Sequence, residues 1–320
     1  MCKGNLNIDL HYYIGFTKEE KIRFASSSGG IGTAIIKYLL ESGKYGTSMT
    51  FVFNTDDCKY EPKLIYDFSE YNNCGSVYQD VDVINFIKDN RCCIKNGIVV
   101  TCMPCQVNAI RSILNRNNIK CFIVSLCCSG QTTIQGTWLY YKLLGVEKAN
   151  VCNIQYRGNG WPSGIQILLK HGGVIKKDNY TYPWNLIHKS LLYRPKRCLF
   201  CTIKTNPNSD VSLADPWLKE YIGNDKMGNS IVITNLDGDR VLKEMLDANL
   251  LSLKKVTKEL YVKSQLGTIE YKAQSKKHVF FNKLVGRMAV EGSIYKNIVT
   301  SSVFFLKLHV KFISLIHKII

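Results

Sequence analysis

The sequence predicts a mixed α/β fold, with a largely parallel sheet flanked by helices and a second half that contains a β-hairpin. Twice, a continuous apolar segment is followed by a cysteine-bearing turn and a helical apolar pattern, over residues 98–114 and 121–144. Such alternation is typical of a parallel sheet covered on both faces. After residue 151 the pattern changes, and two apolar segments flank His171-Gly172-Gly173. A hairpin is expected there.

The first part of the chain contributes a strand and a helix to this prediction. Residues 12–16 are expected to form an edge strand, and residues 31–39 have the apolar spacing of a helix face. The segment Ser-Ser-Ser-Gly-Gly at 26–30 precedes that helix. Its serines suit a helix N-cap, and its glycines would let a ligand approach the backbone closely. The helix N-terminus suits a phosphate, although a plain N-cap explains the same residues.

Further elements follow from the same periodicities. Strands are expected at 49–53, 211–213 and 230–233, and helices at 81–87, 184–193 and 240–251. The chain is predicted to divide into a domain over 1–250 and a basic helical extension over 251–320.

The charge of the chain is concentrated near its C-terminal end. The formal net charge is +17, and residues 253–320 hold 13 Lys or Arg against 3 Glu. This surplus favours an anionic partner such as a membrane surface, nucleic acid or an acidic redox protein, or is simply a solvated surface. The apolar segment 303–320 carries Lys307, Lys311 and Lys318 at helical spacing. That helix is expected to pack on the domain or a partner, or to lie on a membrane surface. No nucleic-acid recognition module is visible, so we expect no nucleic-acid partner.

Thirteen cysteines in a chain without a secretory signal pattern indicate a reducing, cytoplasmic location and metal or redox chemistry. No apolar segment is long enough to span a bilayer. Six of the cysteines cluster at three places: Cys102 and Cys105, Cys127 and Cys128, and Cys198 and Cys201. The others are expected to be small buried hydrophobic residues.

The three cysteine clusters predict one metal centre. Ends of neighbouring parallel strands meet in one crevice, which would bring Cys105 close to Cys128. Two Cys-x-x-Cys pairs either bind zinc or share an iron–sulfur cluster. Arg194, Lys196 and Arg197 precede the last pair and would offset thiolate charge. A structural zinc site and a thioredoxin-like dithiol at 102–105 remain as alternatives.

These motifs together resemble the coenzyme F420 hydrogenase/dehydrogenase beta-subunit family. The matching segments are Cys-Met-Pro-Cys-Gln at 102–106, Cys-Cys-Ser-Gly at 127–130, Arg-Pro-x-x-Cys-x-x-Cys at 194–201 and Ser-Asp-Val-Ser-Leu-Ala-Asp-Pro-Trp at 209–217. Further matches lie at 27–30, 75–78 and 157–161, in the order of the family. The resemblance is to the C-terminal domain type. Many members also carry a ferredoxin-like segment of closely spaced cysteines, where this chain has only Cys2.

The resemblance implies an enzyme, a flavin and iron–sulfur oxidoreductase that binds FAD and a [4Fe–4S] cluster. It implies cluster ligands at Cys105, Cys128, Cys198 and Cys201, with Cys102 and Cys127 as neighbours. It places the flavin near six residues: Ser27, Ser28, Gly29, Gly30, Ser76 and Tyr78. Met103, Ser129 and Pro216 depart from the family pattern.

The resemblance also implies partners. Electrons would come from a separate protein such as a ferredoxin and pass to a small molecule or a deazaflavin such as coenzyme F420. Related chains without the ferredoxin-like segment accompany surface-polysaccharide synthesis enzymes. Arg157 and Trp161 would hold an anionic or ring-shaped substrate, or simply form a structural loop. The alternative is a non-enzymatic protein, stabilised by zinc or a cluster, that docks on an anionic surface.

Overall fold

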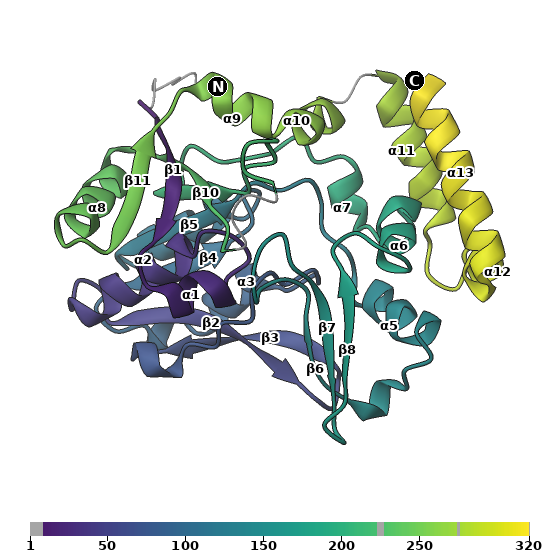
Figure 1. The fold of residues 1–320 in the computed structure, drawn as a ribbon, viewed down its shortest axis with the longest axis horizontal. Helices are drawn as coiled ribbons and strands as arrows, with labels where there is room; N and C mark the ends of the chain where they lie inside the picture. The colour runs from purple at the N-terminus through teal and green to yellow at the C-terminus, as the bar shows by residue number, and fades with distance from the viewer. Residues whose placement is uncertain (1–8, 223–226, 274–275, 320) are drawn as a thin grey trace.

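The computed structural model describes residues 9–222, 227–273 and 276–319, and the side chains of these except at 276 and 317–319. Cys2 and the side chain of Lys318 therefore lie outside the described part. An eight-stranded mixed sheet has the order β11-β1-β10-β9-β5-β4-β2-β3, and a separate antiparallel sheet has the order β6-β7-β8 (Figure 1). This confirms the predicted fold class.

The strands are β1 (His11–Thr17), β2 (Thr47–Asn54), β3 (Lys59–Ile65), β4 (Ile98–Cys102), β5 (Cys121–Leu126), β6 (Val151–Gln155), β7 (Gly164–Leu169), β8 (Val174–Asp178), β9 (Val211–Ala214), β10 (Ser230–Thr234) and β11 (Leu251–Lys255). The helices are α1 (Glu20–Ala25), α2 (Ile31–Glu41), α3 (Val83–Asp89), α4 (Val107–Arg116), α5 (Ile134–Leu143), α6 (Trp184–Ser190), α7 (Lys196–Leu199), α8 (Leu236–Asp247), α9 (Lys258–Ser264), α10 (Leu266–Lys272), α11 (Lys276–Met288), α12 (Ile294–Ser301) and α13 (Val303–Ile319).

Four parallel strands, β9, β5, β4 and β2, form the centre of the large sheet. Antiparallel strands flank them, with β3 on one side and β10, β1 and β11 on the other. The predicted edge position of the first strand is wrong, because β1 pairs with β10 and β11 at once. Both partners lie more than 200 residues later in the sequence, so no local sequence pattern predicts this pairing.

Helices cover both faces of the sheet because neighbouring residues on a strand point to opposite sides. Val99 and Val124 contribute to a core cluster with α2 and α8, whereas Val100 and Ile123 contribute to one with α3 and α4. The continuous apolar strands of the sequence are therefore explained by a sheet buried on both faces.

The second half contains the predicted hairpin, formed by β7 and β8, with β6 as a third strand beside it. The predicted boundary at residue 250 falls before β11, which pairs with β1 in the main sheet. The helical part therefore begins later, at Lys258. Figure 1 shows helices α11–α13 together at one end of the molecule, with α8 and β11 at the other.

Asp210, just before β9, connects this strand to β5 and α4 through its carboxylate. Its substitution therefore provides a test of this packing. Its carboxylate accepts from the Ile123 backbone N–H at 2.6 Å and from Arg111 Nη2 at 2.8 Å, and the residue is 4% exposed. We expect Asp210→Asn to lower the free energy of unfolding by roughly 3 kcal/mol, because it weakens buried charge-assisted hydrogen bonds. Urea unfolding measures this. The matched substitution Asp89→Asn, on the exposed end of α3, should change stability by less than about 0.5 kcal/mol.

Candidate functional site

The carboxyl ends of β4 and β5 bring two cysteine-bearing turns to the same edge of the sheet. The strands are parallel and in register, with Cys102 opposite Ser125. Cys105 lies three residues beyond β4 and Cys128 two residues beyond β5. The predicted approach of these two turns is thus explained by strand pairing.

The third cysteine segment is held against both turns by one backbone hydrogen bond and two side-chain hydrogen bonds to backbone carbonyls. The N–H of Cys128 donates to the carbonyl of Lys204 at 3.0 Å. From the other turn, the Cys105 carbonyl accepts from Arg197 Nη2 at 3.1 Å and the Pro104 carbonyl from Asn206 Nδ2 at 2.9 Å. Segments about ninety residues apart in sequence therefore form one structural unit.

The thiols of the four predicted ligands interact within this unit. Cys105 and Cys201 are hydrogen-bonded to each other, and Cys128 lies within the electrostatic range of Cys198 and Cys201. The hydrogen bond from Cys105 lowers the pKa of Cys201 to about 5; burial opposes this shift and the nearby Lys272 adds to it. The same bond, together with burial, raises the pKa of Cys105. The hydrogen bond and Lys272 therefore favour one thiolate within the Cys105–Cys201 pair.

Lys272, at the end of α10, supplies a buried cation beside these thiols. Its side chain is 2% exposed, and its Nζ lies 2.6 Å from the carbonyl oxygen of Ile203 and 3.6 Å from Cys201 Sγ. No carboxylate pairs with it among the residues that the structure describes. The Ile203 carbonyl and the Cys201 sulfur are therefore the partners that stabilise this buried ammonium, and a thiolate at Cys201 would stabilise it most.

The neighbouring cysteines have other surroundings. Cys102 is 2% exposed in the core beneath α4, and the thiol of Cys127 donates to Gln265 Oε1 at 3.5 Å. The expectation that the remaining cysteines are small buried residues is confirmed for Cys58 and Cys74 and is wrong for Cys92 and Cys93, which are exposed. Cys121 and Cys152 are half-buried. Within the described residues, no three His, Cys, Asp or Glu side chains are already placed to hold a metal ion.

The predicted flavin residues lie on two loops, and a third loop, which carries Arg157, lies against them. The hydroxyl groups of Ser27 and Ser76 are 2.8 Å apart, and Arg157 Nη2 donates to the Ser27 carbonyl at 2.6 Å. Tyr78 stacks on Trp184, with ring centroids 6.2 Å apart. Segments 27–30, 75–78 and 157–161 of the sequence are therefore neighbours in space, although nothing in their local patterns requires it.

The serines before α2 do not cap it. Its N-cap is Gly30 in the left-handed conformation (φ 74°), without a side-chain hydrogen bond. Ser28 instead bonds the hydroxyl of Ser230 at 2.8 Å. A Cβ on Gly29 would lie 2.5 Å from the Gly15 carbonyl oxygen, so close packing on β1 already requires this glycine. A phosphate at the α2 N-terminus stays a prediction.

Arg157 and Trp161 form a structural loop, the second of the two interpretations of these residues. Arg157 is 4% exposed and makes a two-pronged ion pair with Asp215, at 2.6 and 3.1 Å. Trp161 is also buried and donates from Nε1 to Asp215 at 3.2 Å. Asp215 therefore fixes the loop between β6 and β7 to the segment after β9, and its carboxylate neutralises the buried Arg157 guanidinium.

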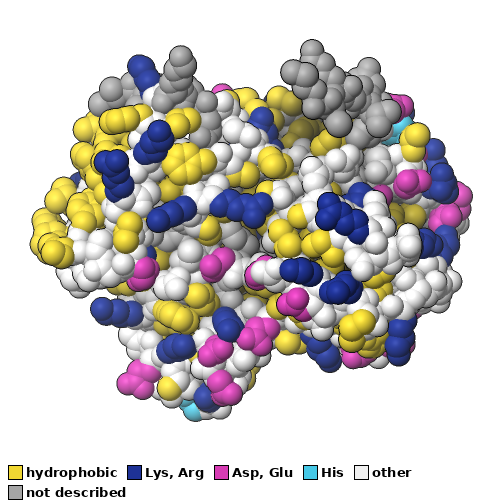
Figure 2. Space-filling view, turned by 180° about the vertical axis from the view of Figure 1, so that it is seen from behind, with side chains coloured by type: hydrophobic (Ala, Val, Ile, Leu, Met, Phe, Trp, Pro, Cys, Tyr) yellow, Lys and Arg dark blue, Asp and Glu magenta, His cyan; other side chains and the backbone are white. Residues whose placement is uncertain are grey.

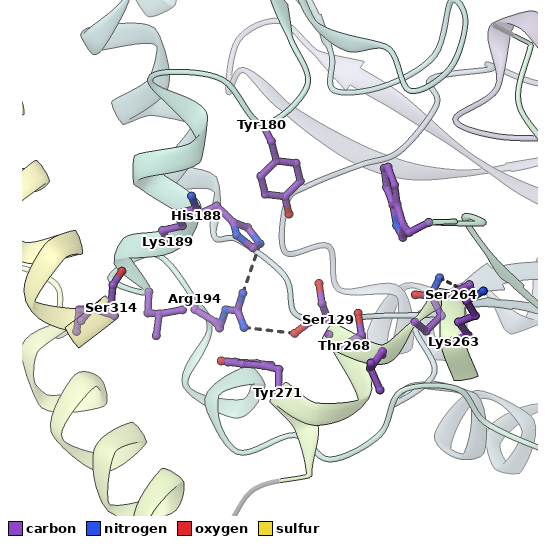
Figure 3. A pocket seen from close by; sticks show the side chains of 16 residues that line it. Ser129, Tyr180, His188, Lys189, Arg194, Lys263, Ser264, Thr268, Tyr271 and Ser314 are labelled. Atoms are coloured by element: carbon purple, nitrogen blue, oxygen red, sulfur yellow. Dashed lines mark hydrogen bonds between the residues drawn. The ribbon is translucent and has the colours of Figure 1, made fainter. Parts of the chain in front are cut away.

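A cavity of about 710 Å³ opens beside Ser129 (Figure 3), the residue that follows Cys128 in the sequence. Residues from α6, α9, α10 and α13 line it, so the C-terminal helices form much of its wall. Its lining includes the cations Lys189, Arg194 and Lys263, and no Asp or Glu is among the described lining residues. Tyr180, Trp217 and Tyr271 add aromatic surface. Such a lining suits an anionic ligand with a flat ring system.

Arg194 holds the two sides of this cavity together. It donates from Nη1 to the Ser129 carbonyl at 3.3 Å, and its Nη2 lies 3.4 Å from His188 Nε2 (Figure 3). A Cβ on Gly130 would lie 2.7 Å from the Arg194 guanidinium carbon, so the glycine of the Cys-Cys-Ser-Gly motif makes room for this arginine. Burial, Arg194 and Lys189 lower the pKa of His188 to about 3, which leaves a neutral imidazole that accepts from Arg194.

Sequence reasoning missed three parts of this site: Lys272, Gln265 and the pair of His188 with Arg194. Lys272 and Gln265 lie in the basic C-terminal region, where they are two polar residues among many. His188 and Arg194 are six residues apart, and they meet because Leu191 adopts a positive φ of 61° at the end of α6. No sequence signal marks that turn, because leucine rarely adopts this conformation.

The fold and the site define a class, a thiol-rich α/β protein with a cationic cavity beside its thiols. Two sequence profiles of the coenzyme F420 hydrogenase/dehydrogenase beta subunit match this chain, one for its N-terminal part over residues 12–88 and one for its C-terminal part over residues 95–259. The chain therefore belongs to the coenzyme F420 hydrogenase/dehydrogenase beta-subunit family, whose members are oxidoreductase-type electron-transfer proteins. Both parts of the beta subunit are present, so the expectation of a C-terminal domain alone was too narrow.

A solved structure has the same fold. A chain of the F420-reducing [NiFe] hydrogenase complex from Methanosarcina barkeri, determined as a xenon derivative, superposes with a TM-score of 0.61. The two are 16% identical over 85% of this chain and 93% of the other. The chain matches no curated protein.

The lowered pKa of His188 gives a test of the cavity. The folded chain keeps this imidazole neutral, whereas the unfolded chain protonates it near pH 6.5. Its contribution to stability is therefore present above pH 6.5 and is lost as the pH falls from there towards about 3. We expect the His188 ring resonances in NMR to show no titration between pH 8 and roughly 5. His188→Gln should flatten the acid-side loss of stability, whereas His171→Gln, in the exposed hairpin turn, should not. Titration of His188 near pH 6.5 would contradict the geometry.

Proposed function

We propose that this chain is an oxidoreductase that binds one [4Fe–4S] cluster and FAD and passes electrons between a protein donor and an anionic ring-containing acceptor. One observation carries the proposal: thiols from three loops interact beside a buried lysine, with Cys105 hydrogen-bonded to Cys201 and Cys128 under the electrostatic influence of Cys198 and Cys201, and a cationic cavity begins at the next residue, Ser129. Membership of the family supports it.

The cluster ligands in this proposal are Cys105, Cys128, Cys198 and Cys201. Four thiolates are the usual ligand set of a [4Fe–4S] cluster. Their surroundings fit the negative charge of such a group, because Arg197 lies against the Cys105 carbonyl and Lys272 against Cys201. Cys102 and Cys127 are not ligands in this proposal. Cys102 is buried in the core, and the thiol of Cys127 is hydrogen-bonded to Gln265.

The flavin in this proposal lies near Ser27, Ser28, Ser76 and Tyr78, with Gly29 and Gly30 shaping the turn before α2. When bound, a flavin exchanges two electrons as hydride and a cluster exchanges one at a time. The chain's own residues would hold the flavin in position. Asp215 and Arg157 fix the loops that carry Ser27 and Ser76, and the α2 N-terminus offers backbone N–H groups to a phosphate.

The acceptor in this proposal enters the cavity between α6, α9 and α10. Lys189, Lys263 and Arg194 would bind its anionic group, and Tyr271 and Trp217 would contact its ring. A deazaflavin such as coenzyme F420 has this chemistry, and so do other anionic cofactors or substrates. A ferredoxin-like donor and a role in surface-polysaccharide synthesis stay predictions.

Anaerobic purification tests the proposal as a whole. We expect about four iron and four sulfide per chain, as the [4Fe–4S] formula requires, together with one FAD. A colourless protein that holds one zinc and no flavin would support the non-enzymatic, metal-stabilised alternative instead.

Serine substitutions test the ligands one at a time. Cys105→Ser, Cys128→Ser, Cys198→Ser and Cys201→Ser should each reduce iron content and cluster absorbance severalfold, because each removes a thiolate ligand. Cys127→Ser is the matched control beside Cys128 and should retain iron. Circular dichroism separates loss of the cluster from loss of the fold. Full iron in Cys128→Ser, with iron lost in Cys127→Ser, would contradict the assignment.

Lys272 tests the electrostatics. Lys272→Met keeps the volume of the buried side chain and removes its charge, which should lower the midpoint potential of the cluster by roughly 100 mV for a charge several ångströms away at an effective dielectric of about 20. Lys196→Met, on the exposed side of α7, should shift it much less, because solvent screens the charge. A redox titration followed by electron paramagnetic resonance measures both. Equal potentials in Lys272→Met and the parent protein would refute this role.

A further inference from the structure

Helices α12 and α13 present an apolar surface to solvent, which we name the C-terminal apolar face. It consists of seven side chains with exposed fractions between 42% and 79%: Ile294, Ile298, Phe304, Phe305, Leu308, Phe312 and Leu315. Figure 2 shows hydrophobic side chains gathered with Lys and Arg at the side of the molecule that α11–α13 occupy. So many large exposed apolar residues on two neighbouring helices mark an interaction surface.

One side of helix α13 is buried against the domain, and another side is exposed to solvent. Leu306, Val310 and Ile313 are buried, and His309 Nε2 lies 2.9 Å from the Ser190 carbonyl oxygen at the end of α6. The exposed residues Phe304, Leu308 and Leu315 follow each other at spacings of four and seven, which places them on one stripe. The helix therefore packs on the domain, as expected from the sequence, and a second apolar stripe remains uncovered.

The charge around this face has one sign. Lys307 and Lys311 are exposed on α13 beside the apolar stripe. The sequences of α11, α12 and α13 contain no Asp or Glu. Glu291, between α11 and α12, is bound by Lys296 at 2.6 Å. A partner of this face must accept apolar side chains and cations together, and an anionic phospholipid surface does so.

We propose that the C-terminal apolar face docks the protein on an anionic phospholipid bilayer, with α13 lying in the plane of the headgroups. This goes beyond the proposed function, because the thiols and the cavity do not require it. The anionic leaflet faces the cytoplasm, which agrees with the expected location. A second copy of the chain is a poorer occupant, because it would bring two lysine-bearing surfaces together.

The geometry indicates a surface helix and not a crossing one. No single helix among the described residues is both long and apolar enough to cross a membrane. The segments Ile294–Ser301 and Val303–Ile316 pass that test only as a pair, and they are bent by 114°. Since one side of α13 is buried against the domain, insertion of the whole helix would expose that core.

Vesicle flotation of the full chain tests the apolar part. We expect binding to vesicles of phosphatidylglycerol mixed with phosphatidylcholine and weak binding to phosphatidylcholine alone. The triple variant Phe304→Ser, Leu308→Ser and Leu315→Ser should bind at least about a hundredfold more weakly, because each buried apolar side chain contributes roughly a factor of ten. The matched control replaces three exposed apolar residues elsewhere by serine, namely Leu168, Val174 and Leu236, and should bind as the parent does.

The charged part has its own test. The double variant Lys307→Glu with Lys311→Glu should abolish the preference for phosphatidylglycerol. Each substitution should weaken binding to the anionic vesicles roughly fivefold or more. Lys176→Glu with Lys177→Glu, on the exposed strand β8, makes the same charge change and should retain the preference. Failure of the parent chain to bind anionic vesicles would overturn the proposal. So would equal binding by the triple variant, or a dimer in solution that the triple variant dissociates, since the face would then belong to a protein interface.

Discussion

The parallel pairing of β4, β5 and β9 is the constraint on which the site depends. Cys102 lies opposite Ser125, and Leu126 lies opposite Leu213. This register places the turns after β4 and β5 at one edge of the sheet. The segment before β9 joins them there through the bond from Cys128 N–H to the Lys204 carbonyl. A slip of one residue would turn alternate side chains to the other face and separate the thiols.

Electrostatics complements this geometry. Thiols that gather in a partly buried place favour the protonated form unless cations are near. Lys272 supplies such a cation from α10, and Arg194 connects the turn after Cys128 to the cavity wall. The C-terminal region therefore has three relations to the site. It provides a buried charge, it lines the cavity, and its helices α12 and α13 carry an outward apolar face.

Much of the fold and of the thiol site was predictable from local patterns. The apolar strands that end at Cys102 and Leu126, each followed by a helix, are sufficient to predict neighbouring parallel strands. The rest depends on pairing between distant segments. The interior position of β1 depends on its pairing with β10 and β11, and the polar sequence of β3 is compatible with its place at the edge of the sheet. A ligand-binding role for Arg157 was considered because the sequence does not show its partner, Asp215, which lies 58 residues away. Lys272 is separated from Cys201 by 71 residues, so no spacing rule connects them.

The most direct measurement of the central claim is cysteine footprinting by mass spectrometry on the anaerobic, iron-loaded protein before and after iron removal. Cysteines protected only by burial, such as Cys102, should react slowly in both states. We predict that Cys105, Cys128, Cys198 and Cys201 are protected while iron is bound and become alkylated together once it is removed. Protection that does not change with iron, or that changes at Cys102 and Cys127 in place of these four, would contradict the assignment of the ligands.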